Sequence, residues 1–309
     1  MNLMVVAYHY FREEKPGKGI YPVTRGEFER QVAEIGKSRT FISQKELADR
    51  MEREDFPDRD FCLITFDDGL KEQMDAFRLL RDAGIPGVFY VPTDPLERGI
   101  VLDVHKLHLV RMSADDRDIF AFLDREAGIS AHPFDPHKLD EIYRWDILLA
   151  QKVKFFLNFV LAGEKKAQVI AKLFSRYVGD EKGFSRKFYM SEEDLRELAK
   201  GGALGAHGKS HRALSLLSPE EAFEEIRYSA EYLRSVSGGK VLSFTYPHGA
   251  ASTVPAGAGG MLSRAGIPFA LTTVSGNNAE DDLRRRYWLK RLDTNDAPGG
   301  RSAGASPVA

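Results

Sequence analysis

Short, almost continuously apolar runs alternate along this chain with segments that have the periodicity of amphipathic helices. The runs cover residues 3–8, 61–66, 87–91, 203–206, 241–246, 269–273 and 287–292. Runs of this kind are typical of parallel strands that are buried on both faces. Because parallel strands need crossover connections, the repeated strand–helix–strand order predicts a closed or nearly closed α/β barrel.

Helix-start signals between these runs support this interpretation. Polar residues with the spacing of capping boxes occur at Thr24 with Glu27, at Ser43 with Glu46, and at Ser218 with Pro219 and Glu221. An open doubly wound sheet is the alternative architecture. No G-x-G-x-x-G sequence follows any of the apolar runs, which argues against a dinucleotide site.

Residues 97–188 interrupt the alternation, because helical periodicity runs through the whole segment. We interpret it as a helical insertion between two units of the barrel, where inserted segments commonly shape a substrate cleft. An ornament or an oligomer contact is the alternative, and the oligomeric state stays open. Residues 297–309 are rich in Gly, Ser, Ala and Pro, which predicts a disordered tail after a domain that spans residues 1–296.

The composition excludes several classes of protein. With 44 Lys and Arg against 46 Asp and Glu, the net charge of −2 gives no electrostatic signature of nucleic-acid binding. Cys62 is the one cysteine, so no disulfide forms within the chain, and its apolar neighbours predict a small buried side chain. No signal-peptide pattern precedes the first run, and no run approaches the ~18 apolar residues of a membrane span. We therefore expect a cytoplasmic protein that does not span a membrane.

Two adjacent carboxylates close the second apolar run, in Thr65-Phe66-Asp67-Asp68-Gly69. Neighbouring side chains on a strand point in opposite directions, so both carboxylates reach one site only if the chain turns there, which Gly69 permits. Two carboxylates in one pocket indicate a cation or a division of roles into metal ligand and base. The alternative is a polar strand end in which Asp68 caps a helix that starts near Leu70.

Two histidines, His207 and His211, follow the run 203–206. Side chains at positions i and i+4 meet on one side if the segment forms a helical turn, and imidazole pairs of this kind commonly bind first-row metals. Surface histidines are the alternative. Together with one aspartate they make a set of three ligands that leaves a coordination position open, which is the catalytic pattern for zinc.

A third polar segment, Tyr246-Pro247-His248-Gly249, follows the run 241–246. Pro247 and Gly249 are typical turn residues, and this places His248 at the rim of the predicted barrel. A turn histidine that faces the solvent is the alternative.

These motifs, in this order, together resemble the polysaccharide deacetylases of carbohydrate esterase family 4, the NodB homology domain. The sequence Arg212-Ala213-Leu214-Ser215 after the second histidine is part of the resemblance, which covers residues 3–296 apart from the insertion. It implies a distorted (β/α)7-type barrel and metal-dependent hydrolysis of an N-acetyl group on a sugar.

The resemblance also implies roles for individual residues. Asp67 would be the general base, and Asp68, His207 and His211 would bind a divalent metal. That metal is usually Zn²⁺, with Co²⁺, Ni²⁺ or Mn²⁺ as alternatives. Metal activation of a water molecule makes a carboxylate base sufficient at neutral pH.

The third segment departs from the family pattern. Tyr246 and the backbone from Pro247 to Gly249 would line the acetate pocket and stabilise the oxyanion. However, many members of the family carry Arg where Thr245 stands and Tyr where His248 stands.

The general acid must also come from an unusual position, because no histidine follows His248. The chain resembles the branch of the family that begins with a Tyr-His strand, which makes His9 the candidate acid and His248 the second candidate. A histidine satisfied within the core is the alternative role for His9. In the late run, Arg291 is a candidate partner that keeps Asp67 ionised, and a surface arginine is the alternative.

The sequence therefore predicts a cytoplasmic hydrolase that removes an N-acetyl group from an amino sugar. We expect its substrate to be an N-acetylated saccharide intermediate of surface-polysaccharide biosynthesis. Three alternatives stay open: a deformylase that acts on a formamido sugar, a non-catalytic sugar-binding protein on a deacetylase scaffold, and a hydrolase of non-sugar cyclic amides.

Overall fold

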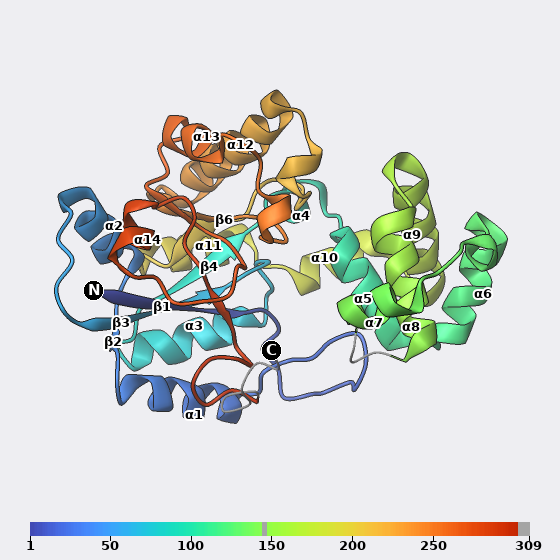
Figure 1. Ribbon diagram of the computed structural model, residues 1–309, viewed down its shortest axis with the longest axis horizontal. Coiled ribbons are helices and arrows are strands. Elements are labelled where there is room, and N and C mark those ends of the chain that lie inside the picture. Colours follow the sequence, from blue (N-terminus) through green and yellow to red (C-terminus); the bar gives the residue numbers. More distant parts are fainter. Residues whose placement is uncertain (144–146, 302–309) are drawn as a thin grey trace. The chain divides into compact units, whose positions relative to one another are not determined.

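The computed structural model describes residues 1–143 and 147–301. The chain divides into two compact units (Figure 1). The barrel unit contains residues 1–14, 22–98 and the chain from residue 186 onward. The helical unit contains residues 15–21 and 99–185.

A parallel sheet forms the centre of the barrel unit. Its strands are β1 (Asn2–Tyr8), β2 (Thr40–Phe41), β3 (Asp60–Phe66), β4 (Gly87–Val91), β5 (Leu204–Ala206), β6 (Ser243–Thr245), β7 (Phe269–Leu271) and β8 (Leu292–Asp293). Their order is β7-β6-β5-β4-β3-β1-β8, and the short β2 pairs with the start of β3. The seven strands in this order curl into a half-barrel with helices around it, which confirms the predicted distorted (β/α) barrel (Figure 1).

The segment before β8 brings the two edges of this sheet together. The N–H of Leu289 donates to the carbonyl of Ala270, 3.1 Å away, and three residues later Leu292 pairs with Val6 of β1. The predicted strand 287–292 is thus wrong in extent, because regular pairing is confined to Leu292–Asp293. The reason is the buried side chain of Asn278, which binds both backbone groups of Lys290 in place of a neighbouring strand.

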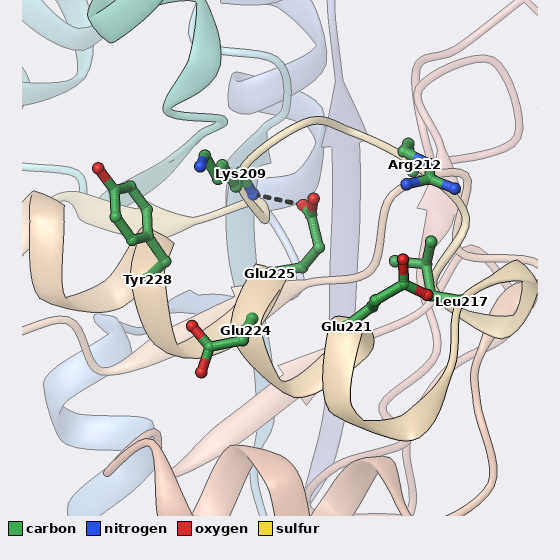
Figure 2. A pocket seen from close by; sticks show the side chains of 7 residues that line it. All are labelled: Lys209, Arg212, Leu217, Glu221, Glu224, Glu225 and Tyr228. Carbon is green, nitrogen blue, oxygen red and sulfur yellow. Dashed lines mark hydrogen bonds between the residues drawn. The ribbon is translucent and has the colours of Figure 1, made fainter. Parts of the chain in front are cut away.

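Helices pack against both faces of the sheet. Those of the barrel unit are α1 (Arg25–Gly36), α2 (Gln44–Arg53), α3 (Gln73–Asp82), α4 (Asp94–Arg98), α11 (Glu192–Lys200), α12 (Pro219–Ser237), α13 (Ala258–Arg264) and α14 (Glu280–Arg284). Thr24 and Ser218 form reciprocal capping boxes as predicted. At Ser43 one half of the predicted box forms, in which the Ser43 side chain accepts a hydrogen bond from the N–H of Glu46. One side of α12 lines a small pocket (Figure 2).

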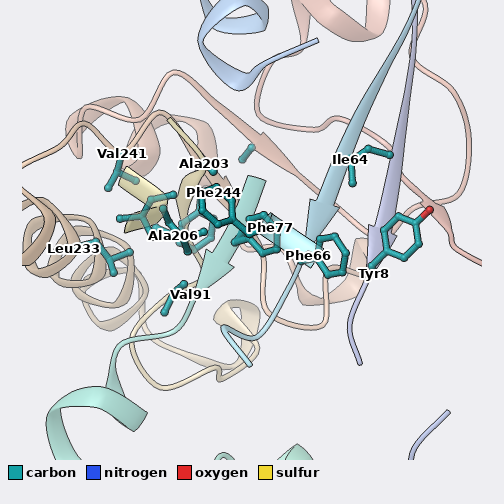
Figure 3. Close-up of a cluster of buried hydrophobic side chains, with 14 of the residues drawn as sticks. Tyr8, Ile64, Phe66, Phe77, Val91, Ala203, Ala206, Leu233, Val241 and Phe244 are labelled. Carbon is teal, nitrogen blue, oxygen red and sulfur yellow. The ribbon is translucent and has the colours of Figure 1, made fainter. Parts of the chain in front are cut away.

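Alternate strand residues face two different hydrophobic cores. Phe66 and Phe244 belong to the outer core, which also contains Phe77 and Leu233 from the surrounding helices (Figure 3). Leu63, on the opposite face of β3, belongs to the inner core. Burial of both faces explains why the strands are almost continuously apolar.

Cys62 also lies in the outer core, where burial raises the pKa of its thiol to about 12. This agrees with the predicted small buried side chain.

The helical unit has a core of its own. It contains α5 (Asp103–Ser113), α6 (Asp116–Ala127), α7 (Pro136–Tyr143), α8 (Leu148–Phe155), a π-helical turn (Phe156–Val160), α9 (Gly163–Tyr177) and most of α10 (Glu181–Phe188). Ile119, Val153 and Leu173 are buried in it. Arg111 and Asp116 form a buried ion pair with 3.1 Å between Nε and Oδ1. The predicted helical character of the insertion therefore agrees with the structure.

The start of the predicted disordered tail needs a correction. Ala297 is fully buried, and its carbonyl accepts a hydrogen bond from the N–H of Gly300. The boundary at 297 was therefore placed too early, while residues 302–309 lie outside the described residues. Within the described part of the chain, no helix combines the length and the hydropathy needed to cross a membrane.

Candidate active site

The chain turns sharply where β3 ends. Asp68 and Gly69 both have left-handed backbone conformations, with φ angles of 80° and 62°. A non-glycine residue in this region is uncommon and is kept only where the surroundings fix it. The turn allows Asp67 and Asp68 to face one site, as the sequence predicted. Helix α3 starts at Gln73 rather than near Leu70, and an Asp68 oxygen faces two histidines instead.

Arg291 holds Asp67 by two hydrogen bonds. Its Nη1 and Nη2 atoms lie 2.9 and 2.7 Å from the two carboxylate oxygens, and its Nε donates to the carbonyl of Thr272. Both side chains are almost completely buried. Burial alone would raise the pKa of Asp67, but the positive charge of Arg291 and the neighbouring His207 outweigh it and lower the pKa. Asp67 is thus an ionised carboxylate inside the protein.

The two histidines meet, but not on a helix. Residues 207–211 form a loop, in which Gly208 and His211 have φ angles of 74° and 59°. The segment is thus not the helical turn through which the histidines could have met, yet the ring centroids of His207 and His211 lie only 4.8 Å apart.

Asp68, His207 and His211 form a group that fits a divalent metal. One possible ligand atom from each lies within 4.8 Å of the others, and Asp68 Oδ1 is 3.5 and 3.2 Å from the two Nε2 atoms. On its other side, the ring of His207 places Nδ1 2.8 Å from the carbonyl of Thr245. A backbone carbonyl at Nδ1 leaves Nε2 as the ligand atom, which is the usual environment of a metal-binding histidine. The donor set is that of a catalytic site with one position open.

The electrostatic environment of this group also favours a cation. Burial lowers the pKa of His207, but the carboxylates of Asp67 and Asp68 outweigh that effect, and the pKa is raised. The two carboxylates thus stabilise positive charge at this position.

His9 lies on the other side of Asp67. Its Nε2 is 4.0 Å from Asp67 Oδ2, and 44% of its side chain is exposed. The buried Gln73 holds the two strand ends together, because its Nε2 donates to the carbonyls of both His9 and Asp67. His9 is therefore not a satisfied core histidine, and it combines access to solvent with proximity to Asp67.

The segment 246–249 contributes in part as expected. The ring of His248 lies 5.0 Å from that of His211, at the exposed rim. Pro247 packs beside Gly208, and Gly249 has a φ of 62° in a position where a Cβ would meet Thr273 at 2.8 Å.

The side chain of Tyr246 departs from the expectation. Its ring lies in the outer core, and its hydroxyl donates to the carbonyl of Tyr287. Tyr246 follows Phe244 by two residues and therefore shares its outward face. The geometry thus brings Asp67, Asp68, His207, His211, His9, His248 and Arg291 together and leaves the Tyr246 ring outside this group.

Sequence reasoning missed two contributors to the site. Gln73 is the first residue of α3, the helix that follows the two aspartates, and it looks like an ordinary polar residue of that helix. Glu225 is on α12 and binds the histidine loop from 15 and 16 positions further along the sequence. The sequence pattern indicates where a strand ends, but it does not indicate which side chains of other elements contact that end.

The chain is similar to known proteins in part of its sequence and in its fold. Residues 145–258 match the family model described as polysaccharide deacetylase. Over this segment the chain is similar to polysaccharide deacetylases. The matched segment includes both histidines and the turn at 246–249, whereas Asp67 and Asp68 precede it. Nothing among the curated proteins matches the chain.

Several solved structures have a fold similar to that of this chain. The deacetylase PplD of Streptococcus pyogenes, solved in complex with acetate, has a TM-score of 0.59 at 14% identity, and 99% of each chain is covered. IcaB of Ammonifex degensii has a TM-score of 0.55 at 17% identity, over 94% of this chain and 91% of that one. The BpsB deacetylase domain of Bordetella bronchiseptica has a TM-score of 0.51 at 16% identity, over 94% and 95%. The match to the family model and the fold together support a hydrolase that acts on amide bonds.

Proposed function

We propose that this protein is a metal-dependent hydrolase that removes the N-acetyl group of an amino sugar. The observation that carries the proposal is the position of the Arg291-paired Asp67 beside Asp68, His207 and His211. An ionised base next to a three-ligand group is the arrangement that amide hydrolysis requires, and a protein that only binds sugar has no need of it.

Asp68, His207 and His211 would hold the metal, for which Zn²⁺ is our first candidate because nitrogen and oxygen donors in a set of three suit it. When bound, a divalent cation supplies Lewis acidity, which polarises an amide carbonyl and lowers the pKa of water towards about 7.

The residues around this group then divide the proton transfers. Asp67 accepts a proton from the attacking water, and Arg291 keeps Asp67 ionised and in one orientation. The water oxygen bonds to the carbonyl carbon, the carbon–nitrogen bond breaks, and acetate and a free amine result. His9, close to Asp67 and open to solvent, donates the proton that the leaving nitrogen needs.

The proposal also covers the substrate and the location of the protein. We propose an N-acetylated saccharide intermediate of surface-polysaccharide synthesis as the substrate and the cytoplasm as the location. Cell fractionation and a panel of N-acetylated sugars, nucleotide sugars and oligosaccharides test these two points.

The deciding experiment combines elemental analysis of the purified protein with measurement of acetate release. We expect about one metal ion per chain and acetate release that a chelator abolishes. Asp67→Asn should lower turnover by about 10²–10⁴-fold and leave the metal content unchanged. Asp68→Asn, one residue further, should lose both.

Other outcomes would replace the proposal. Release of formate instead of acetate would identify a deformylase. A protein with neither metal nor turnover would be a sugar-binding scaffold, and full activity of Asp67→Asn would contradict the role of the base.

A further inference from the structure

The loop between the two histidine ligands lacks the hydrogen bonds that a helix would give it. Its backbone groups must therefore find partners elsewhere, because buried N–H and C=O groups are costly to leave unpaired. The carbonyls of Gly208 and Lys209 accept from the N–H groups of Thr93 and Asp94, 3.3 and 2.9 Å away. These two bonds fix the loop from the side of α4.

A single carboxylate fixes the loop from the other side. Oε2 of Glu225 accepts hydrogen bonds from the N–H groups of both Lys209 and Ser210, at 2.9 and 2.8 Å. Oε1 accepts a third bond from the Ser210 hydroxyl at 2.6 Å. Figure 2 shows Glu225 rising from α12 towards the loop. Hydrogen bonds to an ionised acceptor are the strong ones, and these three converge on two consecutive residues.

The position of these bonds matters more than their number. Lys209 and Ser210 stand between His207 and His211, so any movement of the two residues changes the separation of the histidine rings. Gly208 and His211 both have left-handed backbone conformations, which costs free energy at His211 and persists only if neighbouring contacts enforce it. Glu225 supplies such contacts.

The geometry points to Glu225 as a positioning residue that sets the spacing of the two histidine ligands and thereby the affinity of the metal site. This inference rests on the proposed function, since it requires that the histidines bind a metal. Partners in the second shell of a metal site typically change its affinity by roughly 10–100-fold when they are removed. We expect an effect at the lower end of that range, because Glu225 acts through the backbone and not on the rings.

The test is titration of the metal-free full-length protein with ZnCl₂, followed by calorimetry, and with CoCl₂, followed by visible absorption. Glu225→Ala should bind Zn²⁺ about tenfold more weakly, and its Co²⁺ spectrum should differ in position or intensity from that of the parent protein. Glu225→Gln should recover most of the affinity. Its amide oxygen can accept both N–H groups, and its NH₂ group can donate to the Ser210 hydroxyl.

A matched control is available one residue away. Glu224 lies on the same helix and lines the same pocket, but its carboxylate pairs with Arg227. Glu224→Ala should keep the parent affinity and spectrum. If Glu225→Ala is too unstable to purify, Ser210→Ala removes one of the three bonds and should weaken Zn²⁺ binding in the same direction by a smaller factor.

The outcomes separate the inference from the function beneath it. Unchanged affinity in Glu225→Ala, or an equal loss in Glu224→Ala, would overturn the positioning role while metal binding by the parent protein stands. A Glu225→Gln variant as weak as Glu225→Ala would show that charge, and not hydrogen bonding, is responsible. Failure of the parent protein to bind either metal would overturn the proposed function itself.

Discussion

The two halves of the candidate site are built in different ways. The base half, Asp67 with Arg291, lies between strand ends inside the barrel, and both side chains are almost fully buried. The metal half is a loop at the rim, where one helix carboxylate and two backbone N–H groups replace regular secondary structure. In the base half, the end of β3 places Asp67, and Arg291 and Gln73 hold it there. A loop needs partners from other elements, so its geometry is the more adjustable of the two.

The largest predicted effect is a difference in kcat between variants of His9, which lies beside Asp67, and of His248, which lies beside the metal loop. His9→Ala, on the base side, should lower kcat by about 10²–10⁴-fold, because the leaving nitrogen loses its proton donor. His248→Ala, beside the metal loop, should leave most of kcat. Steady-state kinetics with metal content as a control checks this. An N-aryl acetamide with an acidic leaving amine should recover activity in His9→Ala, and the reverse ranking of the two variants would assign the acid to His248.

Arg291→Met should be the next largest change. It leaves the buried carboxylate of Asp67 without its partner, and breaking a buried ion pair in this way costs about 3–5 kcal/mol of unfolding free energy. The exposed pair of Arg25 with Glu29 is the matched control, and Arg25→Met should cost about 0–1 kcal/mol. Denaturant unfolding of both variants measures the difference. Equal costs would mean that the base half is no more tightly built than the surface.

The same pair predicts a dependence of stability on pH. Since the pKa of Asp67 is lowered below its ordinary value of 3.8, its ionised form stabilises the folded state above that value, and the contribution is lost as pH falls through the lower folded pKa. The difference in unfolding free energy between the metal-free parent protein and Asp67→Asn should therefore be constant above about pH 5 and shrink in more acidic solution. A difference that grows towards low pH would contradict the ion pair.

The smallest predicted effect lies on the metal side. Thr245→Val removes a hydroxyl that is 2.6 Å from Nδ1 of His207 but keeps the carbonyl that also contacts this atom. Because the carbonyl suffices to hold the ring, Zn²⁺ affinity should fall by a factor well below the roughly tenfold typical of a lost second-shell partner. Calorimetric titration checks this. A loss as large as that of Glu225→Ala would make the hydroxyl the group that orients His207.

The sequence predicted the strands best where both faces are buried. Gly87–Val91 was placed to the residue, because an apolar run between turn residues leaves little choice of boundaries. The run 287–292 failed because the side chain of Asn278, twelve residues earlier, takes over the backbone bonds of Lys290. Periodicity reports which residues are buried but not which partner satisfies their backbone.

The site shows the same division. The pairing of Arg291 with Asp67 was an expectation drawn from the resemblance to the family, and the structure brings the two together. The histidines were expected to meet through a helical turn, yet they meet through a loop that Glu225 supports. Residue types and their spacing indicated which atoms converge. The means of convergence depends on tertiary contacts, which a single sequence does not record.

The pairing of Val6 with Leu292 has a consequence for the order of events during synthesis. His9 emerges from the ribosome among the first residues and Arg291 almost three hundred residues later, yet both lie against the same carboxylate. The helical unit, by contrast, is almost wholly drawn from one continuous stretch. A nascent chain can therefore fold that unit before Arg291, the partner of Asp67, has been synthesised. The site is complete only when the segment that leads into β8 has been added.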